Sequence, residues 1–374
     1  MAENLWFQSP FSADGKRTTA RGVFYLSQQK YNIQIHANQV HLHFNEGVHS
    51  DVFRGVQSVD SGQVDSFADA LIRQTLREQF EPKKRHNLHL ADAYQLAQIQ
   101  NGADKAVRLA ACARWLEFAV PPEGDDKRFK ITKTSSCHVR LCPVCQWRRS
   151  RNTFRNLAMI YEDSRLRGQK HLFVTLTQRN VPAEGLRQEI KRLSDAFTAM
   201  LRRKPLKDIV KGYTRTIEIT RNPKTGEYHP HIHAIWTVSK RYGRDQYISQ
   251  AALTEEWKKA LKIDYNPVCN IQLIKNLNGK SVAEVAKYSV KPTDYITETI
   301  QETAKIVEDL DPSLDGKRFV SYGGLVKDVK QQLFSSKPLE DIEAETIPKA
   351  EWENWEKVLY EWHFSDGKYK KITV

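Results

Sequence analysis

Residues 212–238 read GYTRTIEITRNPKTGEYHPHIHAIWTV, and this stretch predicts a β-hairpin around which the fold is built. Residues 212–220 alternate in polarity as a half-buried strand does, and residues 231–238 form the return strand. The connection at 221–228 contains proline and glycine, which are typical of a turn.

Three histidines lie at alternate positions in the second half of the hairpin, namely His229, His231 and His233. Because successive strand side chains point to opposite faces, His231 and His233 share a face. Folding the hairpin brings Glu218 opposite them, with a slip of a residue or two left open. This trio predicts a divalent-cation site that can still accept a phosphate oxygen. His229 precedes Pro230 and is expected to support the site; histidines on a solvated strand face are the alternative.

A second motif, SVAEVAKYSVK at 281–291, predicts a helix that stops at the following proline. On such a helix Glu284, Tyr288 and Lys291 form one stripe. A phenol with a pKa near 10 is a poor nucleophile, but a neighbouring cation, Lys291 or Lys287, favours the phenolate. A carboxylate beside it can accept a proton. The stripe thus predicts a tyrosine nucleophile, and an ordinary exposed Glu/Lys helix is the alternative.

The cysteines Cys137, Cys142 and Cys145 form a C-x4-C-x2-C cluster that suits a tight thiolate knuckle around tetrahedral zinc. A fourth ligand is needed, for which Cys112 is the best candidate and His138 the second. An odd total of five cysteines favours a reduced compartment over a disulfide framework, so a cytoplasmic location is expected.

The chain is strongly basic, with 58 Lys and Arg against 45 Asp and Glu and a net charge of +13. This excess favours a polyanionic partner, nucleic acid first. A mean hydropathy of −0.61 and the lack of a long apolar run predict no membrane span. The residues expected to contact DNA phosphates are Arg148, Arg149, Arg151 and Lys287, although each alone could be a solvated surface charge.

The remaining patterns predict helices and strands around the hairpin, which indicates an α+β fold. Residues 24–44 alternate as strands do, and a polar linker is expected at 51–70. The tail beyond 338 suggests a small helix and hairpin. The other helices are expected at 85–120, 184–204 and 249–263, and the other strands at 171–177 and 268–274.

Three motifs together resemble a known family: FVTLTQRN at 173–180, YHPHIHAIW at 228–236 and EVAKYSVK at 284–291. In this order and spacing they are similar to the rolling-circle replication initiator (Rep) proteins of small bacterial plasmids, in the HUH endonuclease superfamily. The resemblance covers residues 85–330. It implies a central antiparallel sheet of about five strands with flanking helices, joined by a zinc-binding segment and additions at both ends. The domains expected are an N-terminal extension (1–84), a helical and zinc-binding segment (85–155), an HUH endonuclease domain (156–335) and a C-terminal appendage (336–374).

The resemblance also implies an activity. His231 and His233 would bind Mg or Mn, with Glu218 as the acidic partner. Tyr288 would attack a phosphate in single-stranded or hairpin-extruded plasmid origin DNA, forming a 5′-phosphotyrosine link and leaving a 3′-OH primer. Glu284 would activate the water that ends the cycle. Host helicase and polymerase are the further partners implied.

Other functions remain open from the sequence alone. One is an HUH single-strand transposase or relaxase, and another is a non-catalytic zinc-containing DNA-binding protein. A tyrosine that follows the histidines favours an initiator or a transposase over a relaxase. Tyr295, beyond the proline that ends the motif, is the weaker candidate for a second nucleophile.

Overall fold

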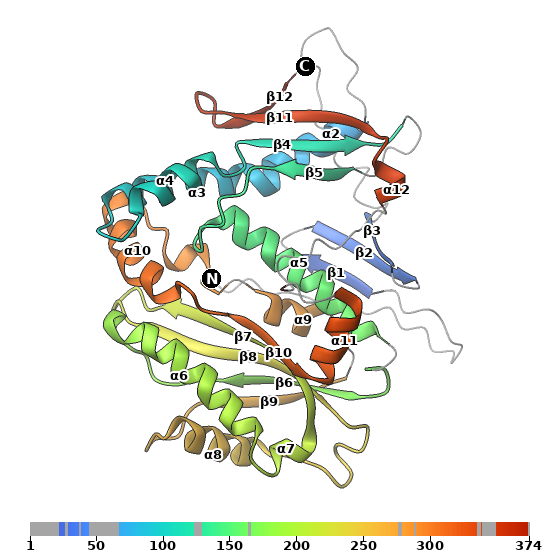
Figure 1. Ribbon diagram of the computed structural model, residues 1–374, viewed down its shortest axis with the longest axis vertical. Helices are drawn as coiled ribbons and strands as arrows, with labels where there is room; N and C mark the ends of the chain where they lie inside the picture. The colour runs from blue at the N-terminus through green and yellow to red at the C-terminus, as the bar shows by residue number, and fades with distance from the viewer. Residues whose placement is uncertain are drawn as a thin grey trace.

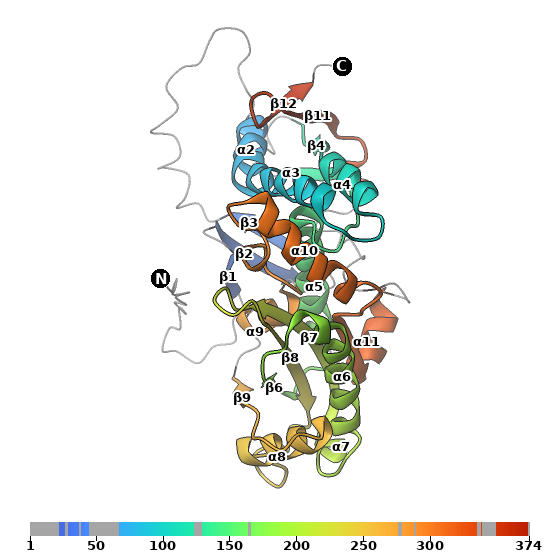
Figure 2. The ribbon, with the colours of Figure 1, turned by 90° about the vertical axis from the view of Figure 1, so that its left-hand side faces the viewer.

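The computed structural model describes residues 22–26, 29–36, 39–44, 67–122, 129–163, 166–275, 279–287, 289–334, 338 and 349–372, and before residue 68 only the backbone. A five-stranded and a four-stranded sheet lie toward opposite ends of an elongated molecule, with helices between them (Figures 1 and 2). A third sheet contains β1 (Gly22–Leu26), β2 (Gln29–His36) and β3 (Gln39–Phe44), where alternation predicted strands. Most of the expected linker lies outside the described residues, and its end already belongs to helix α2 (Phe67–Thr75).

The five-stranded sheet is antiparallel throughout, in the order β10-β7-β8-β6-β9. Its strands are β6 (Lys170–Leu176), β7 (Val210–Arg221), β8 (Tyr228–Val238), β9 (Cys269–Ile274) and β10 (Val320–Gly324). The predicted α+β class with a central antiparallel sheet of about five strands is thus confirmed.

The central hairpin has the register that brings Glu218 opposite His231. In its turn the Asn222 side chain accepts hydrogen bonds from the backbone N–H groups of Lys224 and Thr225. Gly226 has a φ of +75°, a conformation that glycine adopts without steric cost. The turn chemistry therefore fixes the register on which the site depends.

Helices cover both faces of this sheet (Figure 1). On one face, helices α6 (Ala183–Leu201) and α8 (Gln250–Leu261) pack against a fully buried row that includes Ile217, Ile232 and Trp236. The other face carries Glu218 and the two histidines. It is approached by α5 (Pro143–Glu162), α9 (Gly279–Ala286) and α11 (Leu325–Phe334), which share a second apolar cluster with Ile235.

The four-stranded sheet combines segments distant in sequence, in the order β12-β11-β4-β5. The tail hairpin of β11 (Glu356–His363) and β12 (Lys368–Ile372) pairs with β4 (Trp115–Val120), and β4 pairs with β5 (Lys130–Thr134). The prediction of helix for 85–120 was therefore wrong for residues 115–120. These residues form a strand because they pair with β11, which is distant in sequence.

Helices connect the two ends of the molecule. The expected helical region contains α3 (Glu81–Leu96) and α4 (Gly102–Ala111). Helix α10 (Ile300–Leu314) packs against both, since Asp311 accepts a hydrogen bond from the Tyr94 hydroxyl at 2.7 Å and pairs with Lys105 at 2.5 Å. The short helices are η3 (Leu76–Phe80), α7 (Leu206–Ile209), η4 (Pro292–Asp294) and α12 (Lys349–Trp352).

The helix expected at 281–291 is shorter than its spacing predicted. Helix α9 ends at Ala286, and the chain then runs beside β7, where the Ile219 N–H donates to the Ser289 carbonyl at 2.8 Å. Lys291 is extended, with φ −73° and ψ 142°, because the residue before a proline disfavours helix. A single helical stripe that includes Lys291 is therefore wrong. Tyr288 lies outside the described residues.

Candidate metal centres and nucleic-acid interface

Three metal-ligand side chains meet on the helix-covered face of the β7–β8 hairpin, and we call Glu218, His231 and His233 the Glu/His cluster. The Nε2 atoms of His231 and His233 lie 3.5 and 3.2 Å from the Glu218 Oε2 atom. All three ligand atoms lie within 4.8 Å of one another. The hairpin register and the two-residue strand period together explain this convergence.

The far ring nitrogens of both histidines are anchored. The His231 Nδ1 atom lies 3.0 Å from the backbone carbonyl of His229, which can only accept, so this nitrogen carries the hydrogen. The His233 Nδ1 atom lies 3.2 Å from the Thr175 hydroxyl on β6. Anchored Nδ1 atoms orient the rings and direct the Nε2 lone pairs toward a shared point, as metal-binding histidines require.

The geometry of the cluster suits a cation at its centre. Hydrogen on the His231 Nδ1 atom leaves the Nε2 atom directed at the Glu218 oxygen, in the position of a metal ligand. Donors ~2.1 Å from one ion are separated by ~3.0 Å at a right angle and ~3.4 Å at a tetrahedral angle. The distance of 3.2 Å lies within this range, and that of 3.5 Å lies just above it. The residues therefore fit a metal ion that keeps further coordination positions open.

Glu218 remains ionised although only 3% of its surface is exposed. Burial alone would raise the pKa of its carboxyl, but hydrogen bonds from His231 and His233 and the ion pair with Lys291 lower the pKa below its usual range. The Lys291 Nζ atom lies 2.9 Å from the Glu218 Oε1 atom. The structure therefore brings Lys291 to the metal-ligand carboxylate, a contact that the spacing of residues 284–291 did not reveal.

The other residues of the predicted tyrosine motif have definite partners. Glu284, near the end of α9, pairs with Lys287 at 2.5 Å. Tyr295 is fully buried, and its hydroxyl donates to the Leu141 carbonyl at 2.5 Å. Tyr295 is thus part of the packing between η4 and the start of α5, which makes it unsuited to attack DNA.

Four cysteines meet at the N-terminus of α5, and we call Cys112, Cys137, Cys142 and Cys145 the thiol cluster. The Cys145 Sγ atom lies 3.6 Å from the Cys112 Sγ atom and 3.7 Å from the Cys137 Sγ atom. The Sγ atoms of Cys142 and Cys112 are 3.5 Å apart. Four sulfurs at ~2.3 Å from a tetrahedral zinc are ~3.8 Å apart. The arrangement therefore fits a structural zinc, with Cys112 rather than His138 as the fourth donor.

The surroundings of the thiol cluster compensate negative charge. Lys84 is fully buried, and its Nζ donates to the carbonyls of Ala110 and Cys112 at 2.6 and 2.7 Å. Burial lowers the pKa of Lys84 to about 8, while the nearby cysteines pull the pKa upward. A buried cation beside four thiols suits a site whose ligands are thiolates.

The arginines that were predicted to contact DNA have different surroundings along the first half of α5. The Arg148 guanidinium donates to the Ser136 hydroxyl at 2.8 Å, and that of Arg151 stacks over Trp147 at 5.0 Å. Arg149 instead lines a pocket together with Lys287. Arg140 lines the same pocket but was not predicted from the sequence. It lies between Cys137 and Cys142, and its position in this basic motif was a signal that could have found it. Thr175 was also missed, although it lies in a quoted motif on the neighbouring strand.

Comparison with known proteins agrees with these features. The profile of a family described as "Replication protein" matches residues 128–370. A protein named "Protein rep" from Bacillus amyloliquefaciens is 34% identical over 311 residues, covering 75% of this chain and 90% of the relative. Another from Lentilactobacillus hilgardii is 35% identical over 277 residues, covering 71% and 84%. A third from Lactiplantibacillus plantarum is 33% identical over 307 residues, covering 77% and 93%.

No solved structure matched this chain. Within the described parts of the chain, every helix is too short or too polar to cross a bilayer. The family match covers more than half of the chain, includes both candidate metal centres apart from Cys112, and extends through the tail hairpin. The chain belongs to the replication protein (Rep) family of plasmid replication initiators.

Proposed function

We propose that this chain nicks and rejoins single-stranded plasmid origin DNA to start rolling-circle replication, with Tyr288 as the nucleophile. The observation that carries this proposal is the anchored Glu/His cluster beside the segment that contains Tyr288. Directly after that tyrosine, the Ser289 carbonyl accepts a hydrogen bond from Ile219, the residue next to Glu218 in β7. This hydrogen bond holds the residue after Tyr288 beside the strand that carries Glu218, which supports the proposal.

The donor set of the Glu/His cluster suits Mg or Mn, because a carboxylate and imidazoles with open positions leave room for a phosphate oxygen. When bound there, the metal would polarise the scissile phosphate. The protein's part is to hold the two rings by their Nδ1 atoms and to keep Glu218 ionised. An aligned, partly desolvated ligand set needs little reorganisation when DNA arrives.

The chemical step exchanges one phosphate ester bond for another. The Tyr288 oxygen attacks phosphorus, the bond from phosphorus to the 3′ oxygen breaks, and the 5′ side stays on the protein as a phosphotyrosyl ester. The phenol loses its proton, and the departing 3′ oxygen gains one and becomes the 3′-OH primer. Rejoining is the reverse attack by a 3′-OH on the phosphotyrosine.

Two lysines of this motif, Lys287 and Lys291, are held by carboxylates. Lys291 pairs at 2.9 Å with Glu218 Oε1, the oxygen that the two histidines do not face, and is proposed to attract the DNA phosphate to the cluster. Glu284, paired with Lys287 at 2.5 Å, lies near the end of α9 and is proposed to take a proton from the water that ends the cycle.

The thiol cluster is proposed to hold zinc for structure rather than chemistry, since four protein donors leave no open position. Origin DNA in single-stranded or extruded form, host helicase and polymerase are the proposed partners, and the cytoplasm the proposed location. Arg148, Arg149, Arg151 and Lys287 are proposed to contact DNA.

A nicking assay tests the proposal. The purified protein is incubated with end-labelled single-stranded origin DNA and Mn²⁺ or Mg²⁺, and products are resolved under denaturing conditions. The wild type is expected to give a free fragment that ends in a 3′-OH and a covalent adduct between the protein and the 5′ phosphate of the other fragment. Tyr288→Phe should abolish the adduct, and Tyr295→Phe, which alters a buried tyrosine, should retain it. An adduct formed by Tyr288→Phe, or no cleavage by the wild type with either metal, would overturn the proposal.

A further inference from the structure

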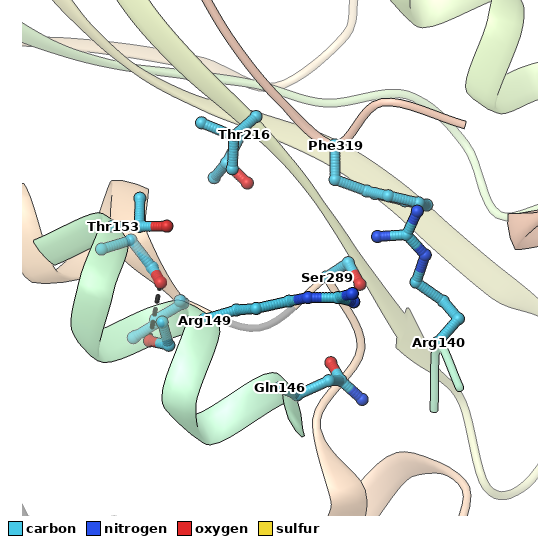
Figure 3. A pocket seen from close by; sticks show the side chains of 11 residues that line it. Arg140, Gln146, Arg149, Thr153, Thr216, Ser289 and Phe319 are labelled. Carbon is cyan, nitrogen blue, oxygen red and sulfur yellow. Dashed lines mark hydrogen bonds between the residues drawn. The ribbon is translucent and has the colours of Figure 1, made fainter. Parts of the chain in front are cut away.

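A small pocket lies between the first half of α5, the segment after α9 and the strands β7 and β10 (Figure 3). Its volume of about 50 Å³ can hold ~three to five water-sized groups, which is enough for a phosphate group. The side chains that concern the argument are Arg140, Gln146, Arg149, Thr216, Lys287 and Phe319.

The pocket adjoins the Glu/His cluster. Thr216 is the cross-strand partner of His233, just as Glu218 is the partner of His231. Thr216 and Glu218 are two residues apart on one strand, so their side chains share a face and stand ~7 Å apart. That separation is close to one phosphate-to-phosphate step along an extended single strand of DNA.

The pocket is cationic without an acidic counterpart, since Arg140, Arg149 and Lys287 line it and none of its lining residues is Asp or Glu. Lys287 is compensated by Glu284, outside the pocket. The Arg140 guanidinium donates to the Lys317 carbonyl at 3.2 Å and stacks on Phe319 at 5.4 Å, which fixes its direction.

The Arg149 side chain is oriented differently from the Arg140 side chain. Figure 3 shows its side chain extending from α5 across the pocket toward Ser289. A guanidinium in that position presents several N–H donors to whatever enters between α5 and β7.

Two buried polar atoms in the pocket have no hydrogen-bond partner among the described residues, the Thr216 hydroxyl and the Gln146 side-chain oxygen. Thr216 is 1% and Gln146 5% exposed. The Gln146 amide is held in one orientation, because its Nε2 donates to Tyr295, whose hydroxyl donates onward to Leu141. Buried groups left unpaired in this way are costly and indicate that a ligand or water completes them.

We propose that this pocket is a phosphate subsite, which holds the DNA phosphate next to the scissile one by contacts from Arg149, Arg140 and the Thr216 hydroxyl. The assignment of DNA as the ligand rests on the proposed function. A phosphate has no hydrogen to donate to the Gln146 oxygen, so a water completes that group. The subsite fixes which phosphate along the strand reaches the Glu/His cluster.

The subsite also gives the thiol cluster a connection to the nuclease sheet. Cys142 caps the N-terminus of α5 and Cys145 lies in its first turn, one helical turn before Arg149. A metal held by the thiol cluster therefore sets the direction of the helix that presents Arg149 to the pocket.

Binding without cleavage tests the subsite separately from the proposed function. The full-length protein is titrated with a labelled single-stranded dT 12-mer, without added Mg²⁺ or Mn²⁺ and without a chelator, at several salt concentrations. Each phosphate contact contributes ~0.7 to the slope of log affinity against log salt for single strands. Arg149→Gln should lower affinity ~tenfold at low salt and reduce the slope by ~0.7. Arg202→Gln is the control, because it removes the same charge from an exposed arginine at the end of α6, on the opposite face of the sheet.

Thr216→Val separates a ligand role from a structural one. Because the Thr216 hydroxyl has no partner among the described residues, its loss should leave the melting temperature unchanged or raised, yet weaken DNA binding ~tenfold, as expected for a hydrogen bond to a charged group. A repeat with a 12-mer of abasic sites distinguishes phosphate from base, and the Arg149→Gln effect should persist on it.

Three outcomes would overturn the subsite. The first is an unchanged salt slope in Arg149→Gln. The second is an equal loss of affinity in Arg202→Gln, which would indicate a diffuse basic surface. The third is an Arg149 effect that disappears on the abasic strand, which would indicate a pocket for bases. None depends on nicking, so a chain that fails to cleave DNA can still pass this test, and the reverse also holds.

Discussion

The thiol cluster and the Glu/His cluster are both buried groups of metal ligands, but they differ in what completes them. The thiol cluster has four equivalent donors with Sγ separations of 3.5–3.7 Å, which fill a tetrahedral ion. The Glu/His cluster has three donors of two kinds and leaves positions open. A closed site stabilises structure, and an open site can bind substrate.

They also differ in how the chain builds them. The Glu/His cluster comes from one hairpin, so a short turn and a strand register suffice to assemble it. The thiol cluster joins Cys112, directly after α4, to three cysteines around the start of α5. A metal there holds together segments distant in sequence, so its loss should affect the fold more than the loss of a metal from the hairpin.

The largest expected effect is therefore on the thiol cluster. Cys142→Ser removes a donor that also caps α5, and we expect zinc to be lost and the melting temperature to fall by ~10 °C or more, because structural zinc contributes many kcal/mol to folding. Zinc content by elemental analysis and thermal unfolding are the measurements.

Cys269→Ser is the matched control, since Cys269 is the fifth buried cysteine and lies outside the cluster. It should keep zinc and lose only a little stability. Equal zinc content in wild type and Cys142→Ser would mean that Cys142 is not a zinc ligand and that the thiol cluster is not a closed zinc site.

The open site should show the opposite behaviour. Glu218→Gln keeps the shape of the side chain but removes the charge that balances a bound cation, so cleavage should slow by roughly a hundredfold to ten-thousandfold. Zinc content should stay at the wild-type level. Single-turnover cleavage of origin DNA and the stabilisation of the protein by Mn²⁺ report on this site.

If Glu218→Gln cleaved at the wild-type rate, the carboxylate would have no part in the metal site. If it lost zinc as well, the two centres would not be independent, and the contrast between a closed and an open site would fail.

The two clusters also differ in how far the sequence predicted them. The strand period and the turn placed Glu218 opposite the histidines, because both signals are local. Lys291 was placed on a helix by spacing, yet it pairs with Glu218, because β7 offers an edge to the chain beyond the point where β10 pairs with it. The free edge of β7 depends on tertiary structure, and the sequence of residues 281–291 does not reveal it.

The same limit applies to the fold around the thiol cluster. Leu116 and Phe118 belong to a strand whose partner is β11, some 240 positions later, and helical spacing up to residue 120 gave no sign of it. Local patterns predicted four strands of the five-stranded sheet, and the sheet itself came from the family resemblance. Strand β10 was not predicted, and its partner β7 lies about 100 positions earlier. Contacts between distant segments, including the pocket lined by Arg140 and Arg149, needed the structure.

The smallest expected effect concerns the anchors of the open site. Thr175→Val removes the hydroxyl 3.2 Å from the His233 Nδ1 atom, so the ring loses its fixed direction, and the affinity for Mn²⁺ should fall ~10- to 100-fold. Thr237→Val is a matched control, because Thr237 lies 3.3 Å from the Nδ1 atom of His171, a buried histidine of the same sheet outside the Glu/His cluster. It should leave Mn²⁺ affinity unchanged at a similar cost in stability. Equal Mn²⁺ affinity in both variants would mean that the hairpin alone orients His233, and that the open site, like the closed one, depends only on its direct ligands.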